Sequence, residues 1–216
     1  MTIGSPGKWG LSAAMLASAL MAAPAFAGNL TVRVTDTGGH PATDAVVTLI
    51  PAKGTPPRPR VESGYRVIQQ GTQFKPFVSV VPVGATVAFP NLDPFRHHVY
   101  SFSKARRFEL KLFARDQTRS VTFDKPGIVA IGCNIHDSMS AYIFVADSVW
   151  TQRVTASGTV RFADIPEGSF TMQIWQPYLR APGGIVSRSL ILRGGDNRES
   201  VTVALRSPPM HSMGGY

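Results

Sequence analysis

The sequence predicts an all-β protein with more than one sheet. Short segments recur in which hydrophobic and polar residues alternate, as in Leu30, Val32 and Val34, and turns rich in Gly, Pro, Asn or Asp separate several of them. After residue 27 we find no stretch with the periodicity of an amphipathic helix and no internal repeat. Short, evenly spaced strands of this kind are typical of β-sandwiches and barrels.

Residues 1–27 are expected to form a cleaved signal peptide. Lys8 provides a positive charge, Leu11–Ala23 is a short apolar stretch, and Ala25-Phe26-Ala27 has the small-residue pattern of a cleavage site. The apolar stretch is shorter than the roughly 20 residues that a membrane-spanning helix needs. We therefore expect an exported, periplasmic protein that begins at Gly28 and has no membrane span after signal removal.

The strands are expected in two groups along the mature chain. Leu30–Val34 and Ala45–Ile50 come first, separated by the turn residues 36–41 and followed by a connection, residues 51–64, that is rich in Pro, Lys and Arg. The middle of the chain then alternates again, and strands are predicted at residues 65–68, 77–81, 85–89, 99–102, 108–113, 119–123, 128–133 and 141–145. The tail, residues 207–216, contains Pro-Pro and Gly-Gly pairs and is predicted to be disordered.

The formal net charge of +9 is compatible with an acidic protein partner or with simple solubility. No concentrated basic run with interleaved aromatic residues is present, so nucleic-acid binding is not expected. A smaller group of basic residues either steers an acidic redox partner or is only a solvated face; its members are Lys104, Arg106, Arg107 and Lys111.

The single cysteine, Cys133, points to a metal site. It cannot form an internal disulfide, and an unpaired thiol in an exported protein needs another role. His136 and Met139 follow it closely, and the pair His97-His98 lies upstream. Two imidazoles, one thiolate and a weak thioether are the ligands of a blue-copper site, which transfers electrons one at a time.

Residues 77–145 resemble the cupredoxins, in particular amicyanin and plastocyanin-like bacterial proteins of the exported methylamine-utilisation type. The matching segments are residues 83–91, 97–99, 123–127 and 133–139, the last with the C-x2-H-x2-M spacing of amicyanin. The resemblance implies a Greek-key sandwich with one type 1 copper ion bound by His97, Cys133, His136 and Met139. His98 occupies a position where the family usually has an asparagine that braces the cysteine loop, and it either substitutes for that brace or faces solvent. Because neighbouring strand residues face opposite sides, only one of the two histidines is expected to face the copper.

The resemblance also implies how electrons enter and leave. In the family they pass through the exposed edge of the loop histidine, which is surrounded by an apolar patch. Here His136 would take that role, with Pro94, Phe95 and Ile135 in the patch. The implied partners are other redox proteins.

The segments on either side resemble a transthyretin-like or carboxypeptidase-regulatory sandwich. Residues 30–50 are similar to its beginning, and residues 154–162 and 165–175 are similar to its continuation. We therefore expect a small sandwich made of residues 28–55 and 148–206, with a cupredoxin domain, residues 64–147, inserted between its strands. The alternative is a tandem order in which the first two strands join the cupredoxin sheet.

Taken together, these features predict a periplasmic type 1 copper protein that carries single electrons between redox partners. The alternatives are a periplasmic copper storage or delivery protein, or an envelope protein with a non-redox binding role. An enzyme is not expected. Multicopper oxidases need His-x-His pairs, and none occurs among the five histidines of the chain.

Overall fold

The computed structural model describes Met1 and residues 27–207, and within this part the chain is all-β, as predicted. The regular elements there are strands β1 to β16 and one short 3-10 helix, Pro182–Gly184. The expected signal peptide, apart from Met1 and Ala27, and nearly all of the expected tail lie outside the described residues. In the part of the chain that the structure describes, no helix is long and apolar enough to cross a membrane.

Strands β3 to β11 form one unit, which we call the central unit. Its larger sheet has the order β5-β11-β10-β7-β8, and β6 pairs with β9 in a second layer. Arg66 and Gln69, just before and in β3, make single bridges to Ala88 and Asn91, in and just after β6. The strand bounds are β3 Ile68–Gln69, β4 Phe74–Lys75, β5 Val78–Pro82, β6 Ala85–Pro90, β7 His97–Phe102, β8 Arg107–Phe113, β9 Thr118–Phe123, β10 Gly127–Gly132 and β11 Ser140–Ala146.

Alternation along the strands builds the core of the central unit. In β6, Ala85, Val87 and Phe89 are buried, whereas the residues between them are at least partly accessible. These side chains belong to one hydrophobic cluster with residues of β7 to β11, and this cluster also contains Cys133 and Met139. Two of the predicted metal ligands on the cysteine loop, Cys133 and Met139, are therefore fixed by the same core that holds the two layers together.

The remaining strands form a second unit, the flank unit, from both ends of the described chain. One sheet has the order β13-β1-β16 and the other β12-β2-β14-β15. The strands β1 and β2, which precede the central unit, thus pair with strands that follow it and not with the sheets of the central unit. The bounds are β1 Ala27–Asp36, β2 Val46–Pro51, β12 Thr151–Arg153, β13 Thr159–Pro166, β14 Gly168–Trp175, β15 Ile185–Leu192 and β16 Gly195–Val203.

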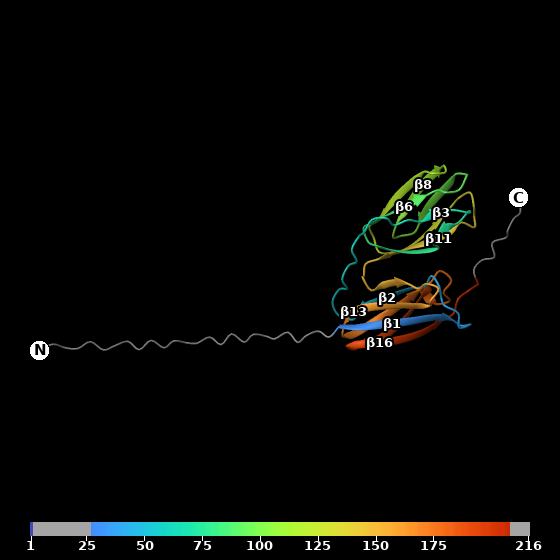
Figure 1. Cartoon of the computed structure of the whole chain (residues 1–216). Helices are drawn as coiled ribbons and strands as arrows, with labels where there is room; N and C mark the ends of the chain where they lie inside the picture. The colour runs from blue at the N-terminus through green and yellow to red at the C-terminus, as the bar shows by residue number, and fades with distance from the viewer. Residues whose placement is uncertain (2–26, 208–216) are drawn as a thin grey trace.

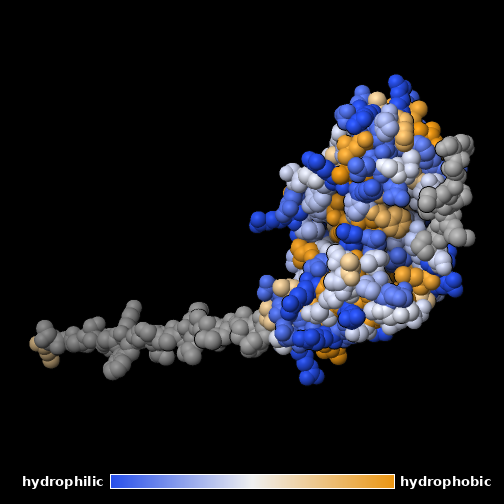
Figure 2. Space-filling view, turned by 45° about the vertical axis from the view of Figure 1, so that its right-hand side comes forward, coloured by the Kyte–Doolittle hydropathy of each residue, from blue (hydrophilic) through white to orange (hydrophobic). Residues whose placement is uncertain are grey.

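An aromatic cluster joins the two units, which lie one above the other in Figure 1. Trp175 of β14 is 7% exposed and packs against Tyr142 and Phe144 of β11, with ring centroids 5.6 and 5.8 Å apart. Val46 of β2 and Val78 of β5 are buried in the same cluster. Away from this joint, the face shown in Figure 2 mixes small groups of apolar residues with polar ones over both units.

Three short strands differ from the prediction. A strand was expected at residues 65–68, but β3 covers only Ile68–Gln69, and Arg66 makes a single bridge to Ala88. The short strands β4 and β12 were not predicted. Each contains only two or three residues, which is too short for an alternating pattern to be recognised.

Candidate metal centre

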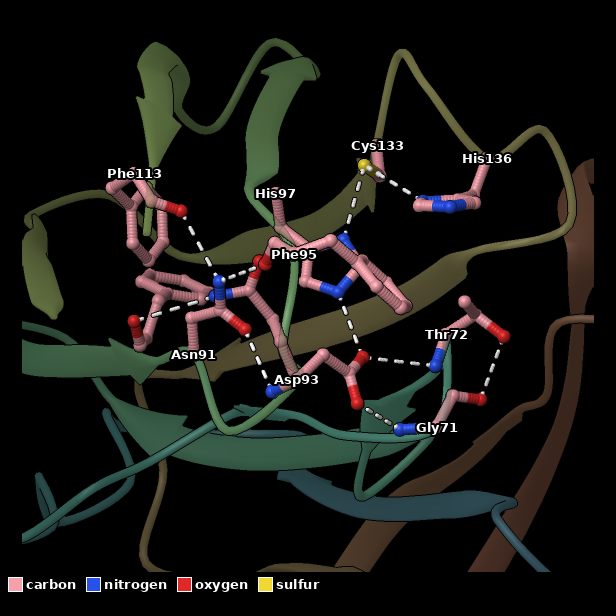
Figure 3. Close-up of polar contacts among 11 residues, drawn as sticks. Gly71, Thr72, Asn91, Asp93, Phe95, His97, Phe113, Cys133 and His136 are labelled. Atoms are coloured by element: carbon pink, nitrogen blue, oxygen red, sulfur yellow. Dashed lines mark hydrogen bonds and ion pairs between the residues drawn. The ribbon is translucent and has the colours of Figure 1, made fainter. Parts of the chain in front are cut away.

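Three of the four predicted ligands meet at one end of the central unit. The Nδ1 atom of His97 lies 3.8 Å from the Sγ atom of Cys133, and the Nδ1 atom of His136 lies 4.0 Å from the same sulfur. The three ligand atoms are all within 4.8 Å of one another. His97 begins β7, whereas Cys133 and His136 lie in the loop that follows β10, as Figure 3 shows.

Two backbone hydrogen bonds close the loop that carries the cysteine. The N–H of Cys133 donates to the carbonyl of Met139 (3.2 Å), and the N–H of Met139 donates to the carbonyl of His136 (2.9 Å). Met139, the fourth predicted ligand, is 1% exposed and packs in the same core as Cys133. The short spacing in the sequence thus becomes a tight loop with both sulfur-containing residues on its inner side.

The second nitrogen of His97 contacts a buried carboxylate. His97 Nε2 lies 2.7 Å from Asp93 Oδ2, and the backbone N–H groups of Gly71 and Thr72 donate to the two carboxylate oxygens at 2.7 and 3.0 Å. Burial raises the pKa of the Asp93 carboxyl, but the hydrogen bonds from His97 and the two backbone groups outweigh burial and lower the pKa overall. The carboxylate is therefore ionised at neutral pH, and the bond to it requires the hydrogen of His97 on Nε2.

Asn91 shapes the turn between β6 and β7 that carries Asp93. Its side chain is fully buried; Nδ2 donates to the carbonyls of Phe95 (2.8 Å) and Phe113 (3.1 Å), and Oδ1 accepts from the N–H of Asp93 (3.0 Å). The turn is thus tied to β8 as well as to the β3–β4 hairpin. This places His97 and Asp93 on a backbone that is held from two sides.

An exposed aromatic side chain lies beside both histidines of the cluster. The ring of Phe95 lies 5.1 Å from that of His97 and 5.4 Å from that of His136, measured between centroids. Phe95, Ile135 and Pro94, the residues expected in the patch, are all exposed, and His136 is half-buried. His97, in contrast, is 0% exposed, so the two histidines differ sharply in their access to solvent.

His98 does not take either of the roles weighed for it. It is 6% exposed rather than facing solvent, and its Nε2 atom lies 3.0 Å from Glu109 Oε1 on β8; within the described residues no hydrogen bond joins it to the cysteine loop. The register of β7 against β8 shifts between His97 and Val99. This irregularity lets both histidines be buried while their rings point to different neighbours.

No protein-family model and no curated protein matches the chain. Among solved structures, a copper-containing nitrite reductase from Thermus scotoductus SA-01 matches 46% of this chain at 26% identity with a TM-score of 0.38, although the match spans only 25% of the reductase. A purple cupredoxin from Nitrosopumilus maritimus is matched over its whole length and 38% of this chain, at 19% identity and a TM-score of 0.36. An oxidised variant of amicyanin is matched over 99% of its length and 48% of this chain, at 17% identity and a TM-score of 0.37.

The chain is similar to cupredoxins. It is the ligand cluster, and not these overall similarities, that indicates the metal. One buried thiol and two imidazole nitrogens within 4.8 Å of one another fit a type 1 copper site, because soft sulfur and imidazole together suit both Cu(I) and Cu(II). The cupredoxin-like arrangement thus rests on side chains that the structure brings together from two distant parts of the chain.

Two residues of the cupredoxin-like site were missed in the sequence. Asn91 and Asp93 both precede His97 in a polar turn, and such residues are common in turns without any role at a metal. The feature of the sequence that could have indicated Asp93 is its place four residues before the predicted histidine ligand His97. Histidines that bind metals usually donate their other N–H to a carboxylate, carbonyl or water, so this spacing was worth noting.

Proposed function

We propose that this chain binds one copper ion through His97, Cys133, His136 and Met139 and carries single electrons between protein partners. The observation that supports this most directly is the convergence of the two Nδ1 atoms and the Cys133 sulfur. A copper ion in such a site supplies a reversible Cu(II)/Cu(I) couple. On this proposal the chain is an electron carrier and has no substrate to transform.

The contacts around the cluster suit that task. His97, Cys133 and Met139 are held in the core, so their positions change little when the charge at the site changes. His136 is half-buried beside the exposed Phe95 and Ile135. An apolar surface around an accessible imidazole edge allows a partner protein to approach the site closely without displacing charged groups.

We also propose that the partner is an acidic protein in the periplasm. Lys104, Arg107 and Lys111 are exposed on and beside the β7–β8 hairpin, where they would attract an acidic surface and raise the rate of encounter at low salt. Arg106 is engaged differently, since it lies 3.5 Å from Asp124. Export rests on the expected signal peptide.

The pairing of β1 and β2 with strands that follow the central unit supports an inserted domain. We infer that a cupredoxin domain, residues 64–147, lies within a small sandwich formed by residues 28–55 and 148–206. If so, residues 64–147 expressed alone should fold and bind copper. Failure of this fragment to fold would contradict the proposed boundaries.

The experiment that tests the function is visible absorption and electron paramagnetic resonance of the Cu(II)-loaded protein, with voltammetry of the same sample. Wild type should show an intense thiolate band, narrow copper hyperfine splitting and a reversible one-electron wave. Cys133→Ala should lose the band, whereas Asn134→Ala, an exposed neighbour, should retain it. A colourless wild-type protein with the same spectrum as Cys133→Ala would contradict the proposal and favour copper storage or delivery.

A further inference from the structure

The turn between β3 and β4 is built to hold the carboxylate of Asp93. Gly71 and Thr72 at its tip both have positive φ angles, +65° and +53°, and their successive N–H groups point at the two carboxylate oxygens. Successive N–H groups in such a turn form a concave site for an anion. The anion that occupies this site is a side chain of the same protein.

The conformation of the turn is unusual enough to need support. A left-handed backbone at a residue with a β-branched side chain, such as Thr72, costs about 1–2 kcal/mol. The hydrogen bond from Gln70 N–H to Gln73 O (3.0 Å) and those to Asp93 hold it in place. The carboxylate and the turn therefore fix each other, and the side chain of Asp93 is only 7% exposed.

A fixed carboxylate also sets the state of His97. With its hydrogen on Nε2, the neutral ring has a lone pair on Nδ1, the atom that lies 3.8 Å from Cys133 Sγ. Figure 3 shows the ring between the sulfur on one side and Asp93 on the other. The ring cannot turn over without breaking the bond to a buried charge, so Nδ1 faces the metal position before any metal arrives.

The negative charge of Asp93 has a second effect, which acts on His97 and not on His136. Asp93 is shielded from solvent and adds a full negative charge next to one ligand, and charges buried in this way are screened weakly by water and salt. A nearby anion stabilises the more positively charged state of a metal ion. His136 is half-buried beside solvent, where any charged neighbour would be screened.

We propose that Asp93 is a positioning residue that orients His97 toward the copper and, as a buried anion, stabilises Cu(II) relative to Cu(I). This inference rests on the proposed copper site and adds a determinant of its reduction potential. The potential is then set in part by the β3–β4 hairpin, which contributes none of the four proposed copper ligands.

The test compares Asp93→Asn with Asp137→Asn. Both variants remove one negative charge near the site, but Asp137 is exposed on the cysteine loop and Asp93 is buried. In Asp93→Asn the ratio of Cu(I) to Cu(II) affinity should rise at least tenfold, which for a one-electron couple is an increase of about 59 mV in potential. Asp137→Asn should change this ratio less than threefold. Equal changes in the two variants would overturn the proposal.

A measurement on the unaltered protein covers the case in which Asp93→Asn does not fold. Pulsed electron paramagnetic resonance of the Cu(II) protein reports the quadrupole coupling of the remote nitrogen of each imidazole. The Nε2 atoms of His97 and His136 should give two clearly different couplings, because one donates to a carboxylate and the other is near solvent. Two identical couplings would refute the inference about Asp93, whereas a wild-type protein without the blue spectrum would refute the proposed function itself.

Discussion

Replacing Asn91 by alanine should strongly destabilise the central unit, although Asn91 is not a proposed copper ligand. The change removes three hydrogen bonds, and two of them, to the Phe113 carbonyl and from the Asp93 N–H, are buried. A buried backbone group without a partner costs about 1–3 kcal/mol. Two such groups give a range of about 2–6 kcal/mol, and the third bond, to Phe95, is partly accessible to water and adds less.

The assay is urea unfolding of the copper-free protein. Far-UV circular dichroism reports both units. Of the tryptophans in the described part of the chain, Trp150 lies in the core of the flank unit and Trp175 lies at the joint, so fluorescence reports the flank unit and the joint. We expect Asn91→Ala to lower the unfolding free energy of the central unit by about 3 kcal/mol, within the range above. Asn134→Ala, an exposed change on the cysteine loop, should stay within about 0.5 kcal/mol of wild type. A loss below about 1 kcal/mol for Asn91→Ala would refute the hydrogen-bond argument.

Three further predictions concern Trp175 at the joint, Gly132 at the end of β10, and Tyr178, whose ring stacks on that of Phe77. Trp175→Ala should lower the free energy of unfolding by about 3–5 kcal/mol and separate the unfolding midpoints measured by fluorescence and by circular dichroism. Coincident midpoints together with a loss below about 1 kcal/mol would contradict the described joint. Gly132→Ala should lower the free energy of unfolding by about 1–3 kcal/mol, because the new Cβ would lie 3.0 Å from the Tyr100 hydroxyl. When Tyr100 is also replaced by alanine, most of this loss should disappear, and an undiminished loss would exclude the contact. Burial, with a smaller effect of Tyr142, raises the pKa of Tyr178. The neutral phenol therefore adds stability that is complete below the unfolded pKa of about 10 and is lost as pH rises through the folded pKa. In unfolding measurements Tyr178→Phe should lose less stability at alkaline pH than wild type, and an identical pH profile of the two proteins would argue against this role.

Local pattern was enough to predict most of the strands and to single out the loop that begins at Cys133. In β6 the alternation of Ala85, Val87 and Phe89 with more accessible residues is visible in the sequence, because one side of this strand faces the core. The spacing of His136 and Met139 after Cys133 is equally local. These features could be predicted because the residues concerned lie within a few positions of one another.

What could not be predicted depends on tertiary contacts. The hairpin that holds Asp93 is brought to the site by single bridges, such as Gln69 to Asn91, that leave no periodic signal. Trp175 and Tyr142 meet at the joint between the units, and no pattern along the sequence indicates that they pack against each other. In both cases the partner lies far away along the chain, so local propensity carries no information about it.

The parallel pairing of β1 with β16 has a consequence for how the protein is made. Asn29 and Asp196, which are hydrogen-bonded across these strands, are 167 residues apart in the chain. The central unit is one continuous stretch and has all its strands as soon as β11 emerges during synthesis, whereas the flank unit must wait for the last strand. Until β13 emerges β1 has neither of its neighbours, and until β16 emerges one edge of β1 stays open to pairing with other chains. The interval between the emergence of the first strand and the arrival of the last is therefore when this chain is most exposed to aggregation and proteolysis.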